Sequence, residues 1–143
     1  MLVEAEAFNH GGYYEMTPGN AANAYRTDES VDVYPCWTCS NDFSIGHIQS
    51  GEYLAYTVYI DKDGVYDFEF NVATVENGAR IQLVVDSQPG GQFAELPNTG
   101  SWAKYQTASL KGIPLTTGLH VLSTVFTAPS QGFAFDYFTY KAQ

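Results

Sequence analysis

Three carboxylates in this sequence have the chemistry needed to hold a cation. Glu4 and Glu6 lie one residue apart in Val3–Phe8, where apolar and acidic residues alternate. That alternation predicts a strand, and because residues i and i+2 of a strand point the same way, both carboxylates would share one face. Oxygen ligands of this kind suit calcium, whereas the simpler interpretation is a solvated face of an edge strand. Asp136 would join the pair if the first and last strands of the fold are neighbours.

Two tryptophans lie in turn-rich sequence, outside any apolar run. Trp102 directly follows Pro97-Asn98-Thr99-Gly100-Ser101, whose residue types favour turns. Trp37 lies in an inserted loop over residues 35–44, close to Tyr34. A large aromatic ring at a loop either covers the core or offers a flat face to a ligand. Residue type leaves both interpretations open for Trp102, and Tyr34 and Trp37 have the alternative of packing against their own loop.

Cys36 and Cys39 form a CxxC motif. This motif occurs as a redox pair, as half of a zinc site or as a local disulfide. A redox pair favours a strand-to-helix setting, which this stretch lacks, and a zinc site needs two more ligands. The three histidines show no HxxxH spacing. We therefore expect a disulfide that pins the loop, with free thiols as the alternative.

Short alternating segments separated by turn residues must position these side chains. The clearest is Val65–Ala73, in which apolar residues alternate with acidic or amide residues. Turn signals recur about every 8–12 residues and no long window has a helical period, a pattern typical of an all-β sandwich or barrel. The predicted strands are Val3–Phe8, Val31–Tyr34, Ile45–Ile48, Tyr53–Ile60, Val65–Ala73, Arg80–Asp86, Trp102–Leu110, His120–Phe126 and Phe133–Tyr140.

The composition fits a single domain over residues 1–143, long enough to bury one core. A chain that is 45% hydrophobic and 15% aromatic is not disordered. Its net charge of −10 argues against nucleic acid and anionic membrane surfaces as partners. We find no signal peptide, so the protein is either cytosolic or a segment of a longer chain. Strand-like sequence at both ends favours the segment, and the charge suits a secreted protein.

A set of motifs runs in order along nearly the whole chain. They are Glu4-Ala5-Glu6, Gly51-Glu52-Tyr53-Leu54-Ala55-Tyr56, Gly64-Val65-Tyr66, Ile81–Asp86, Asn98–Trp102, Leu119–Leu122 and Phe133–Phe138. None is diagnostic alone, but in this order the set resembles carbohydrate-binding module family 6. The resemblance implies an all-β, two-sheet β-sandwich of the jelly-roll, lectin-like kind, which is usually attached to a secreted glycoside hydrolase.

The resemblance also implies a structural calcium ion. In the family its ligands include acids of the N-terminal strand, a backbone carbonyl from the following loop and the aspartate of the last strand. Residue by residue, these positions fall on Glu4 and Glu6, on roughly Arg26, and on Asp136. This agrees with the cation site expected from the paired carboxylates.

The family's sugar cleft lies among loops at one edge of the sandwich, where two aromatic rings clamp a sugar and an asparagine hydrogen-bonds to it. Trp102 matches the first ring, but His47 stands at the position of the second and Ala134 at that of the asparagine. The cleft must therefore recruit other residues. Our candidates are Tyr34 or Trp37 for the ring, Gln131 or Ser130 for the amide, and Glu15 as a hydroxyl-binding carboxylate.

The prediction is a non-catalytic, monomeric module that binds a neutral polysaccharide, an agar-type galactan, a β-glucan or a xylan, and targets an attached glycoside hydrolase to it. One alternative is a small β-sandwich glycoside hydrolase or lyase, which needs two carboxylates in a cleft. Glu15, Asp28, Glu29, Asp32 and Glu52 are acidic candidates, but they form no recognisable pair. The other alternative is a structural or adhesion domain of a surface protein.

Overall fold

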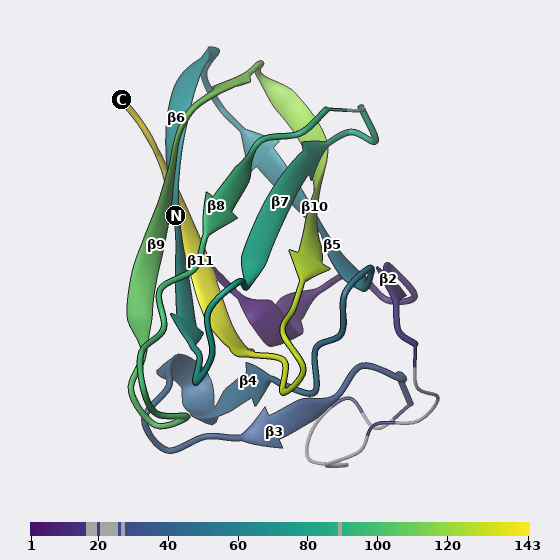
Figure 1. Cartoon of the computed structure of the whole chain (residues 1–143). Coiled ribbons are helices and arrows are strands. Elements are labelled where there is room, and N and C mark those ends of the chain that lie inside the picture. Colours follow the sequence, from purple (N-terminus) through teal and green to yellow (C-terminus); the bar gives the residue numbers. More distant parts are fainter. Residues whose placement is uncertain (17–19, 21–25, 27, 89) are drawn as a thin grey trace.

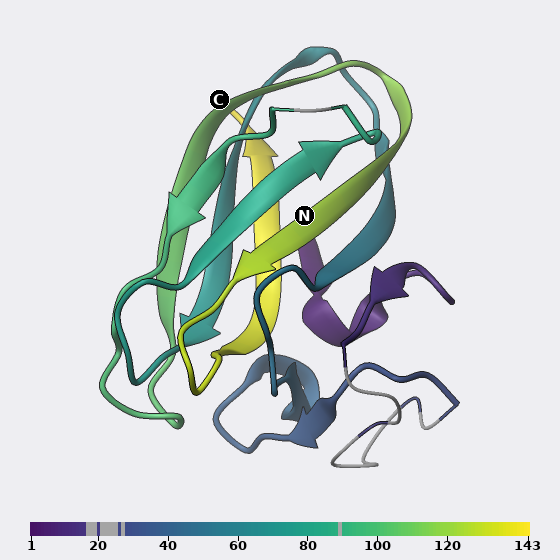
Figure 2. The ribbon, with the colours of Figure 1, turned by 45° about the vertical axis from the view of Figure 1, so that its right-hand side comes forward.

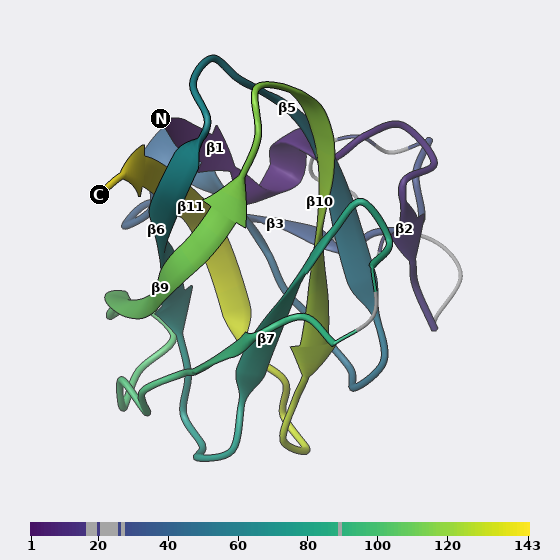
Figure 3. The same cartoon turned by 90° about the horizontal axis from the view of Figure 1, so that it is seen from above.

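The computed structural model describes residues 1–16, 20, 26, 28–88 and 90–143, which form two antiparallel β-sheets packed face to face (Figures 1 and 3). The strands are β1 (Leu2–Glu4), β2 (Tyr13–Tyr14), β3 (Val33–Pro35), β4 (Phe43–Ile45), β5 (Tyr53–Ile60), β6 (Gly64–Ala73), β7 (Arg80–Val85), β8 (Phe93–Glu95), β9 (Gln106–Leu115), β10 (Gly118–Thr127) and β11 (Ala134–Ala142). Two short 3₁₀ helices are η1 (Ala5–Ala7) and η2 (Ser40–Asp42). The predicted all-β sandwich is confirmed.

The first and last strands are neighbours in one of the two sheets. That sheet has the order β3-β4-β11-β6-β9 with β1 also paired to β11, and the other has the order β2-β5-β10-β7-β8. In the β1–β11 pair, Glu4 lies opposite Tyr137. Figure 3 shows β6, β9 and β11 in one layer and β5, β7 and β10 in the other. The topology thus brings the N-terminal acids to the strand that carries Asp136.

Aromatic side chains fill the space between the sheets. The alternation predicted for β6 is observed, since Phe68 and Phe70 are fully buried while the acidic residues between the aromatics face outward. Phe138 of β11 stacks on Phe68 at 6.2 Å between ring centroids and meets Tyr56 of β5 edge-on at 5.1 Å. Burial of each such ring stabilises the fold by about 1.5–3 kcal/mol, so the core fixes the frame that carries the loops.

The predicted first strand is too long. β1 ends at Glu4, and Glu6 lies in η1, because local carbonyls are bonded by side chains and not by a strand ladder. The Tyr56 hydroxyl donates to the Ala5 carbonyl at 2.7 Å, and Arg26 Nη1 donates to the Glu6 carbonyl at 3.0 Å. Glu6 is consequently 2% exposed, which rules out the solvated edge-strand face as its setting.

The strand predicted at Trp102–Leu110 instead runs over β9, and Trp102 lies in the turn before it. β9 is an edge strand, which tolerates Gly112 and Pro114 where an inner strand would not. The Gly112 amide donates to the Asp67 side chain at 3.1 Å, beside a register shift in the β6–β9 pair. β2 and β8 were not predicted, because two or three residues are too few to show a period.

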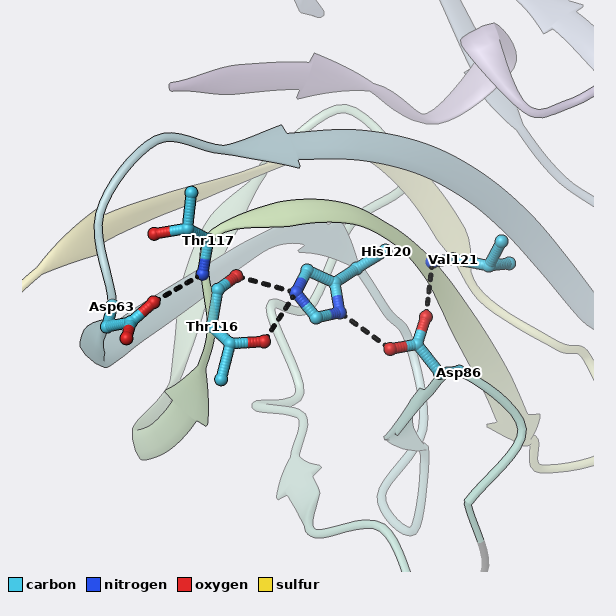
Figure 4. A network of polar contacts seen from close by, with 6 residues as sticks. All are labelled: Asp63, Asp86, Thr116, Thr117, His120 and Val121. Atoms are coloured by element: carbon cyan, nitrogen blue, oxygen red, sulfur yellow. Dashed lines mark hydrogen bonds and ion pairs between the residues drawn. The ribbon is translucent and has the colours of Figure 1, made fainter.

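A polar network fixes the end of the sandwich that lies at the top of Figure 1. His120 Nδ1 lies 2.6 Å from Asp86 Oδ2, and His120 Nε2 lies 2.7 Å from the Thr116 carbonyl oxygen (Figure 4). The Val121 amide donates to Asp86 Oδ1 at 2.8 Å. The Asp86 hydrogen bond and the Thr116 carbonyl raise the pKa of His120. The hydrogen bonds from His120 and from the Val121 amide lower the pKa of Asp86. This network ties the β9–β10 turn to the end of β7.

Among the described residues, no helix has the length and apolar character needed to cross a membrane.

Candidate functional site

A cleft of about 370 Å³ lies at the opposite end of the sandwich, near β3 and β4 at the bottom of Figures 1 and 2. Three parts of the chain build it: the β3–β4 hairpin with the residues just after it, the β8–β9 connection, and the β10–β11 connection with the start of β11. Its lining consists of Tyr34, Pro35, Cys36, Ser44, Gly46, His47, Trp102, Tyr105, Gln131, Phe133 and Ala134. Residues far apart in sequence therefore meet in one concave site of the size that small ligands occupy.

The loop that carries Trp102 is fixed by reciprocal hydrogen bonds between two buried threonines. The Thr74 amide donates to Thr99 Oγ1 at 3.0 Å, and the Thr99 amide donates to the Thr74 carbonyl at 3.0 Å. The Gly100 amide also reaches the Thr74 carbonyl at 3.0 Å. Trp102 itself stays 44% exposed. The turn-rich motif thus has a rigid base and presents a half-open ring at the cleft.

The β3–β4 hairpin forms the second wall. Tyr34 packs flat against Gly46, where a Cβ atom would come within 2.7 Å of the Tyr34 ring. The Gly46 amide donates to the Asp32 carbonyl at 2.9 Å, which extends the hairpin pairing toward His47. A side chain at position 46 would therefore push the Tyr34 ring from its place.

The hairpin is extended by the expected disulfide, which joins Cys36 to Cys39 with 5.5 Å between their Cα atoms. The Cys36 amide donates to the Asp42 carbonyl at 2.8 Å, at the base of the loop. Cys36 is also a lining residue of the cleft, so the disulfide belongs to the wall of the site.

Tyr105 is the cleft aromatic that the sequence analysis missed. It hydrogen-bonds to Ser44 of β4, and its hydroxyl oxygen lies 3.6 Å from Cys36 Sγ. Burial, with a smaller contribution from the Asp136 charge, raises its pKa. No signal in the sequence distinguishes Tyr105 from an ordinary strand residue, because its role depends on where the β8–β9 connection crosses β4.

A close backbone approach brings Gln131 beside His47. Gly132 has a φ of 72°, and a Cβ atom there would lie 2.6 Å from the Ile48 carbonyl oxygen. This conformation and contact require glycine. The backbone amide of Gln131 donates to Glu76 Oε1 at 2.8 Å. The Gln131 side chain is thereby left at the exposed rim of the cleft.

The structure brings together four of the six predicted ligand residues, namely Trp102, His47, Tyr34 and Gln131. Trp37 is not in the lining and is 91% exposed, so it does not replace the missing clamp ring inside the cleft. Glu15 is not a lining residue either, although it lies close enough to affect Tyr34 electrostatically. Ala134 lines the cleft and, as expected, offers no polar group there.

The surroundings of the cleft are negative, although its lining contains no carboxylate. Burial raises the pKa of Tyr34, and the charges of Asp32 and Glu15 raise it further. Asp136 has the same effect on Tyr105. A negative potential of this kind disfavours anionic ligands. The cleft therefore suits an uncharged ligand with apolar faces and hydroxyl groups.

No pair of carboxylates is placed for glycoside hydrolysis among the described residues that line the cleft. Glu52 is 2% exposed and accepts bonds from the Met16 and Gln49 amides, each at 2.8 Å, which is a structural role. Glu29 is likewise buried, beside His10 and Arg26.

The three carboxylates of the predicted cation site surround one short loop. Burial raises the pKa of Glu6 to about 7 and that of Asp136 to about 6, and the Glu4 charge raises both. One oxygen of each carboxylate, Glu4 Oε2, Glu6 Oε1 and Asp136 Oδ1, is buried without a hydrogen-bond partner. Buried oxygens of this kind call for a cation or a proton. The cluster therefore fits a hard cation such as calcium.

The disulfide loop rests directly on this acidic cluster. The Ser40 amide donates to Asp136 Oδ2 at 3.0 Å, its hydroxyl donates to Glu4 Oε1 at 2.5 Å, and Asn41 Nδ2 donates to Glu6 Oε2 at 3.1 Å. In each carboxylate, the oxygen that accepts these bonds is the one opposite the unpartnered oxygen. The acidic cluster and the cleft wall are thus two sides of one short loop.

Arg26 lies beside the cluster, and its side chain and its backbone carbonyl make separate contacts. Its guanidinium group donates to the Glu6 and Phe8 carbonyls and covers the Phe8 ring. Its own carbonyl, the expected cation ligand, accepts the Glu29 amide at 2.9 Å. In the described part of the chain, the side chains whose ligand atoms all lie within 4.8 Å of one another form a different group, His10, Asp28 and Glu29.

Comparison with known proteins decides the family. A model of carbohydrate-binding module family 6 matches residues 21–142. The chain belongs to carbohydrate-binding module family 6. It is therefore a carbohydrate-binding module. The resemblance stated from the ordered motifs is confirmed.

Relatives of this family 6 module are parts of longer enzymes. It is 34% identical over 110 residues to endo-1,4-beta-xylanase A of Thermoclostridium stercorarium, covering 76% of the module and 21% of that protein. It is 28% identical over 121 residues to the beta-agarase AgaO of Microbulbifer thermotolerans, covering 81% of the module and 9% of the agarase. The module thus spans about a fifth or less of the curated relatives that it matches.

A solved structure shares its fold over nearly the whole length. The C-terminal family 6 module of LamC, a marine laminarinase from Zobellia galactanivorans, superposes with a TM-score of 0.76 at 19% identity. The match covers 99% of this module and 98% of the other chain. At this identity the similarity shows the common sandwich and leaves the ligand open.

Proposed function

We propose that the module binds a neutral polysaccharide in the cleft at the end of the sandwich. The observation that carries this proposal is the lining of the cleft, which combines Trp102, Tyr34 and Tyr105 with His47 and Gln131 and includes no carboxylate, lysine or arginine. The apolar C–H faces of sugar rings pack on aromatic planes, and their hydroxyls take a few placed polar partners. The negative surroundings disfavour uronic or sulfated chains.

The candidate ligands are agar-type galactans, β-glucans and xylans. The relatives named above are a xylanase, an agarase and a laminarinase, which supports this range. His47 and Ala134 stand where the family usually has a ring and an asparagine, and residues 35–44 form an inserted loop. These departures favour an agar-type galactan or a β-1,3-linked glucan over the commonest xylan pattern.

We infer that the 143 residues form one module that targets an attached glycoside hydrolase to its polysaccharide. The small share of the relatives that the module covers supports an appendage role. The relatives also support a secreted, extracellular setting. The module would work as a monomer without nucleic-acid or membrane partners, consistent with its net charge of −10.

We also infer that Glu4, Glu6 and Asp136, with the Arg26 carbonyl, hold a structural calcium ion. The support is the three buried oxygens without hydrogen-bond partners. Calcium would supply the positive charge that this cluster lacks and would fix β1, β11 and the disulfide loop to one another. It would have no part in the contact with sugar.

A polysaccharide screen followed by one substitution tests the proposal. The module is run in affinity electrophoresis through agarose, β-1,3-glucan, mixed-linkage glucan and xylan, and the best ligand is then tested with Trp102→Ala. Tyr59→Ala is the matched control, because Tyr59 is a 59% exposed aromatic at the far end of β5. Retardation should be lost with Trp102→Ala and kept with Tyr59→Ala. Unchanged retardation of Trp102→Ala would show that the cleft is not the binding site.

A further inference from the structure

Trp37 is the most exposed large apolar side chain among the described residues, at 91%. It lies at the tip of the four-residue turn that the Cys36–Cys39 disulfide closes. Burial of a tryptophan ring yields a substantial favourable free energy, so the folded chain gives up that gain here. A single exposed apolar residue is ordinary on a protein surface, so exposure alone does not mark a site. The question is therefore whether this loop is free to fold its ring inward.

The loop is not free, because every residue around its tip is tied down. The disulfide holds Cys36 to Cys39, and the Cys36 amide is bonded to the Asp42 carbonyl at 2.8 Å. Immediately beyond Cys39, Ser40 and Asn41 are bonded to the three carboxylates of the acidic cluster. Covalent closure and a buried base therefore hold the backbone that carries the exposed ring. Because that backbone is already ordered, less entropy is lost when the ring meets a ligand.

The position of Trp37 relates it to the cleft. Cys36 lines the cleft, and Trp37 is the next residue, whose Cα atom lies about 3.8 Å from that of Cys36. A cleft of about 370 Å³ is at the small end of ligand sites, so a polysaccharide chain must run out of it. A chain that leaves past Cys36 meets the turn that carries Trp37.

We propose that Trp37 is an outer subsite, which stacks against a sugar residue of the same polysaccharide chain outside the cleft. The inference rests on the proposed function and adds to it a preference for length. Chains that reach from the cleft to Trp37 bind more tightly than short oligosaccharides that occupy the cleft alone. The ligand class is thus a long, uncharged chain that continues beyond the residue held by Trp102.

A length series tests this assignment. Affinities of the wild type and Trp37→Ala are measured by calorimetry for the oligosaccharides of the best ligand, from the disaccharide to the hexasaccharide, and for the polysaccharide. We expect Trp37→Ala to match the wild type on the shortest oligosaccharides and to bind the longest chains about tenfold more weakly, the value of one stacking contact. Trp37→Tyr should recover most of this loss, and Tyr59→Ala should show none.

The tryptophan fluorescence of Trp102→Phe gives an independent measurement. In this variant Trp37 is the sole tryptophan. Saturating polysaccharide should shift or quench its emission, and a short oligosaccharide at saturation should not. An emission that does not respond to polysaccharide, or a Trp37→Ala loss that is equal at all lengths or absent, would overturn the outer subsite.

Failure of this inference and failure of the proposed function have different signatures. If Trp102→Ala abolishes binding while Trp37→Ala binds every chain like the wild type, the cleft stands and the outer subsite falls. If Trp102→Ala binds like the wild type, the cleft proposal falls first.

Discussion

The two tryptophans of this module are presented by loops that are built in opposite ways. The Trp102 loop is held by hydrogen bonds between buried Thr74 and Thr99, and its ring turns partly into the cleft. The Trp37 loop is held by a disulfide and by an acidic cluster, and its ring remains in solvent. One ring belongs to a concave site, and the other extends beyond it.

The difference shows how a small sandwich can hold one ring inside its binding cleft and present another ring outside it. Buried hydrogen bonds fix the Trp102 loop against the core, so its ring forms one fixed wall of the cleft. A covalently closed turn needs no core of its own and can project a ring where the fold has nothing to bury. Substitutions can separate these two supports, and the largest effect is expected at Trp102.

Removing the Trp102 ring should weaken binding at every chain length. Trp102→Ala deletes the aromatic wall of the cleft, and anchor aromatics of this type are worth about 2 kcal/mol or more, equivalent to about 30-fold in affinity. The melting temperature should change little, because the ring is 44% exposed. Calorimetry with the same length series measures both tryptophans on one scale. A loss confined to long chains would exchange the roles that we assign to Trp102 and Trp37.

Calcium removal should act on the Trp37 loop and leave the Trp102 loop intact. A ligand present at a hundred times its dissociation constant stabilises the folded state by about 2.7 kcal/mol, so chelation should lower the melting temperature by about 10 °C. Glu6→Gln is the matched variant, because it should remove most of the calcium response. A melting temperature that is the same with calcium and with chelator, after dialysis long enough to remove a trapped ion, would contradict the calcium proposal.

The free energy of unfolding of the calcium-free module should also depend on pH, and the buried carboxylates determine the direction of this dependence. Burial raises the pKa of Glu6 from 4.5 to about 7 and that of Asp136 from 3.8 to about 6. The folded state then binds more protons than the unfolded chain between about pH 4 and 7, so its free energy of unfolding falls as pH rises through this range. Calcium replaces the protons and should abolish this fall. Thermal unfolding from pH 4 to pH 8, with and without calcium, measures it.

Breaking the threonine pair should loosen the Trp102 loop. Thr99→Val removes the hydroxyl that accepts the Thr74 amide and donates to its carbonyl, each at 3.0 Å. A buried donor left without a partner costs about 1–3 kcal/mol in free energy of unfolding. We expect cleft affinity to fall about fivefold as the ring loses its fixed position. Thr99→Ser keeps the hydroxyl and should retain both stability and affinity; equal losses in the two variants would exclude the hydrogen bonds as the cause.

Removing the disulfide should weaken the binding of long chains more than the binding of short oligosaccharides. The double variant Cys36→Ser, Cys39→Ser frees a closed turn of four residues, for which chain entropy gives at most about 2 kcal/mol. Affinity for long chains should fall about threefold, and affinity for short oligosaccharides should fall less. In a Trp37→Ala background the same double substitution should add nothing for long chains beyond its effect on short ones. A further loss specific to long chains in that background would show that the disulfide supports long-chain binding independently of the Trp37 ring.

The far end of the sandwich supplies the smallest effect and a control for both loops. The raised pKa of His120 means that its contribution to stability is present below its ordinary pKa and is lost as pH rises through the raised value. The lowered pKa of Asp86 places the loss of its contribution at more acidic pH. His120→Gln should therefore lower the melting temperature by a few degrees near pH 5.5 and hardly at all near pH 9. Ligand affinity should not change at either pH.

Much of the fold could be predicted because the period of two along each strand determines which residues are buried. The alternation in Val65–Ala73 predicts that Phe68 and Phe70 lie in the core, where both are fully buried. The same rule failed for Glu6, since the chain turns at Ala5 where tertiary hydrogen bonds replace the strand ladder. Edge strands as short as β2 and β8 carry too few residues to show a period.

The cleft could be predicted only in part, and for a different reason. Trp102 and Gln131 lie in turn-rich segments that reach the end of any sandwich, so their sequence context marks them. Tyr105 and Thr74 have no such context, because one depends on a crossing over Ser44 and the other on a partner 25 residues away. The inserted loop makes Trp37, like Tyr34, a candidate for the missing clamp ring. The closed turn holds its ring outside the cleft instead.

The course of β11 has a practical consequence for attaching this module to other objects. Ala134 lines the cleft, and the strand then runs away from it for nine residues, roughly 27 Å at about 3.4 Å per residue. Gln143 follows at the opposite pole, and the terminal ammonium group of Met1 is bonded to the Tyr140 carbonyl at 2.9 Å on the same side (Figures 1 and 2). A bead, dye or sensor surface joined through Gln143 would therefore leave both tryptophans facing the solution.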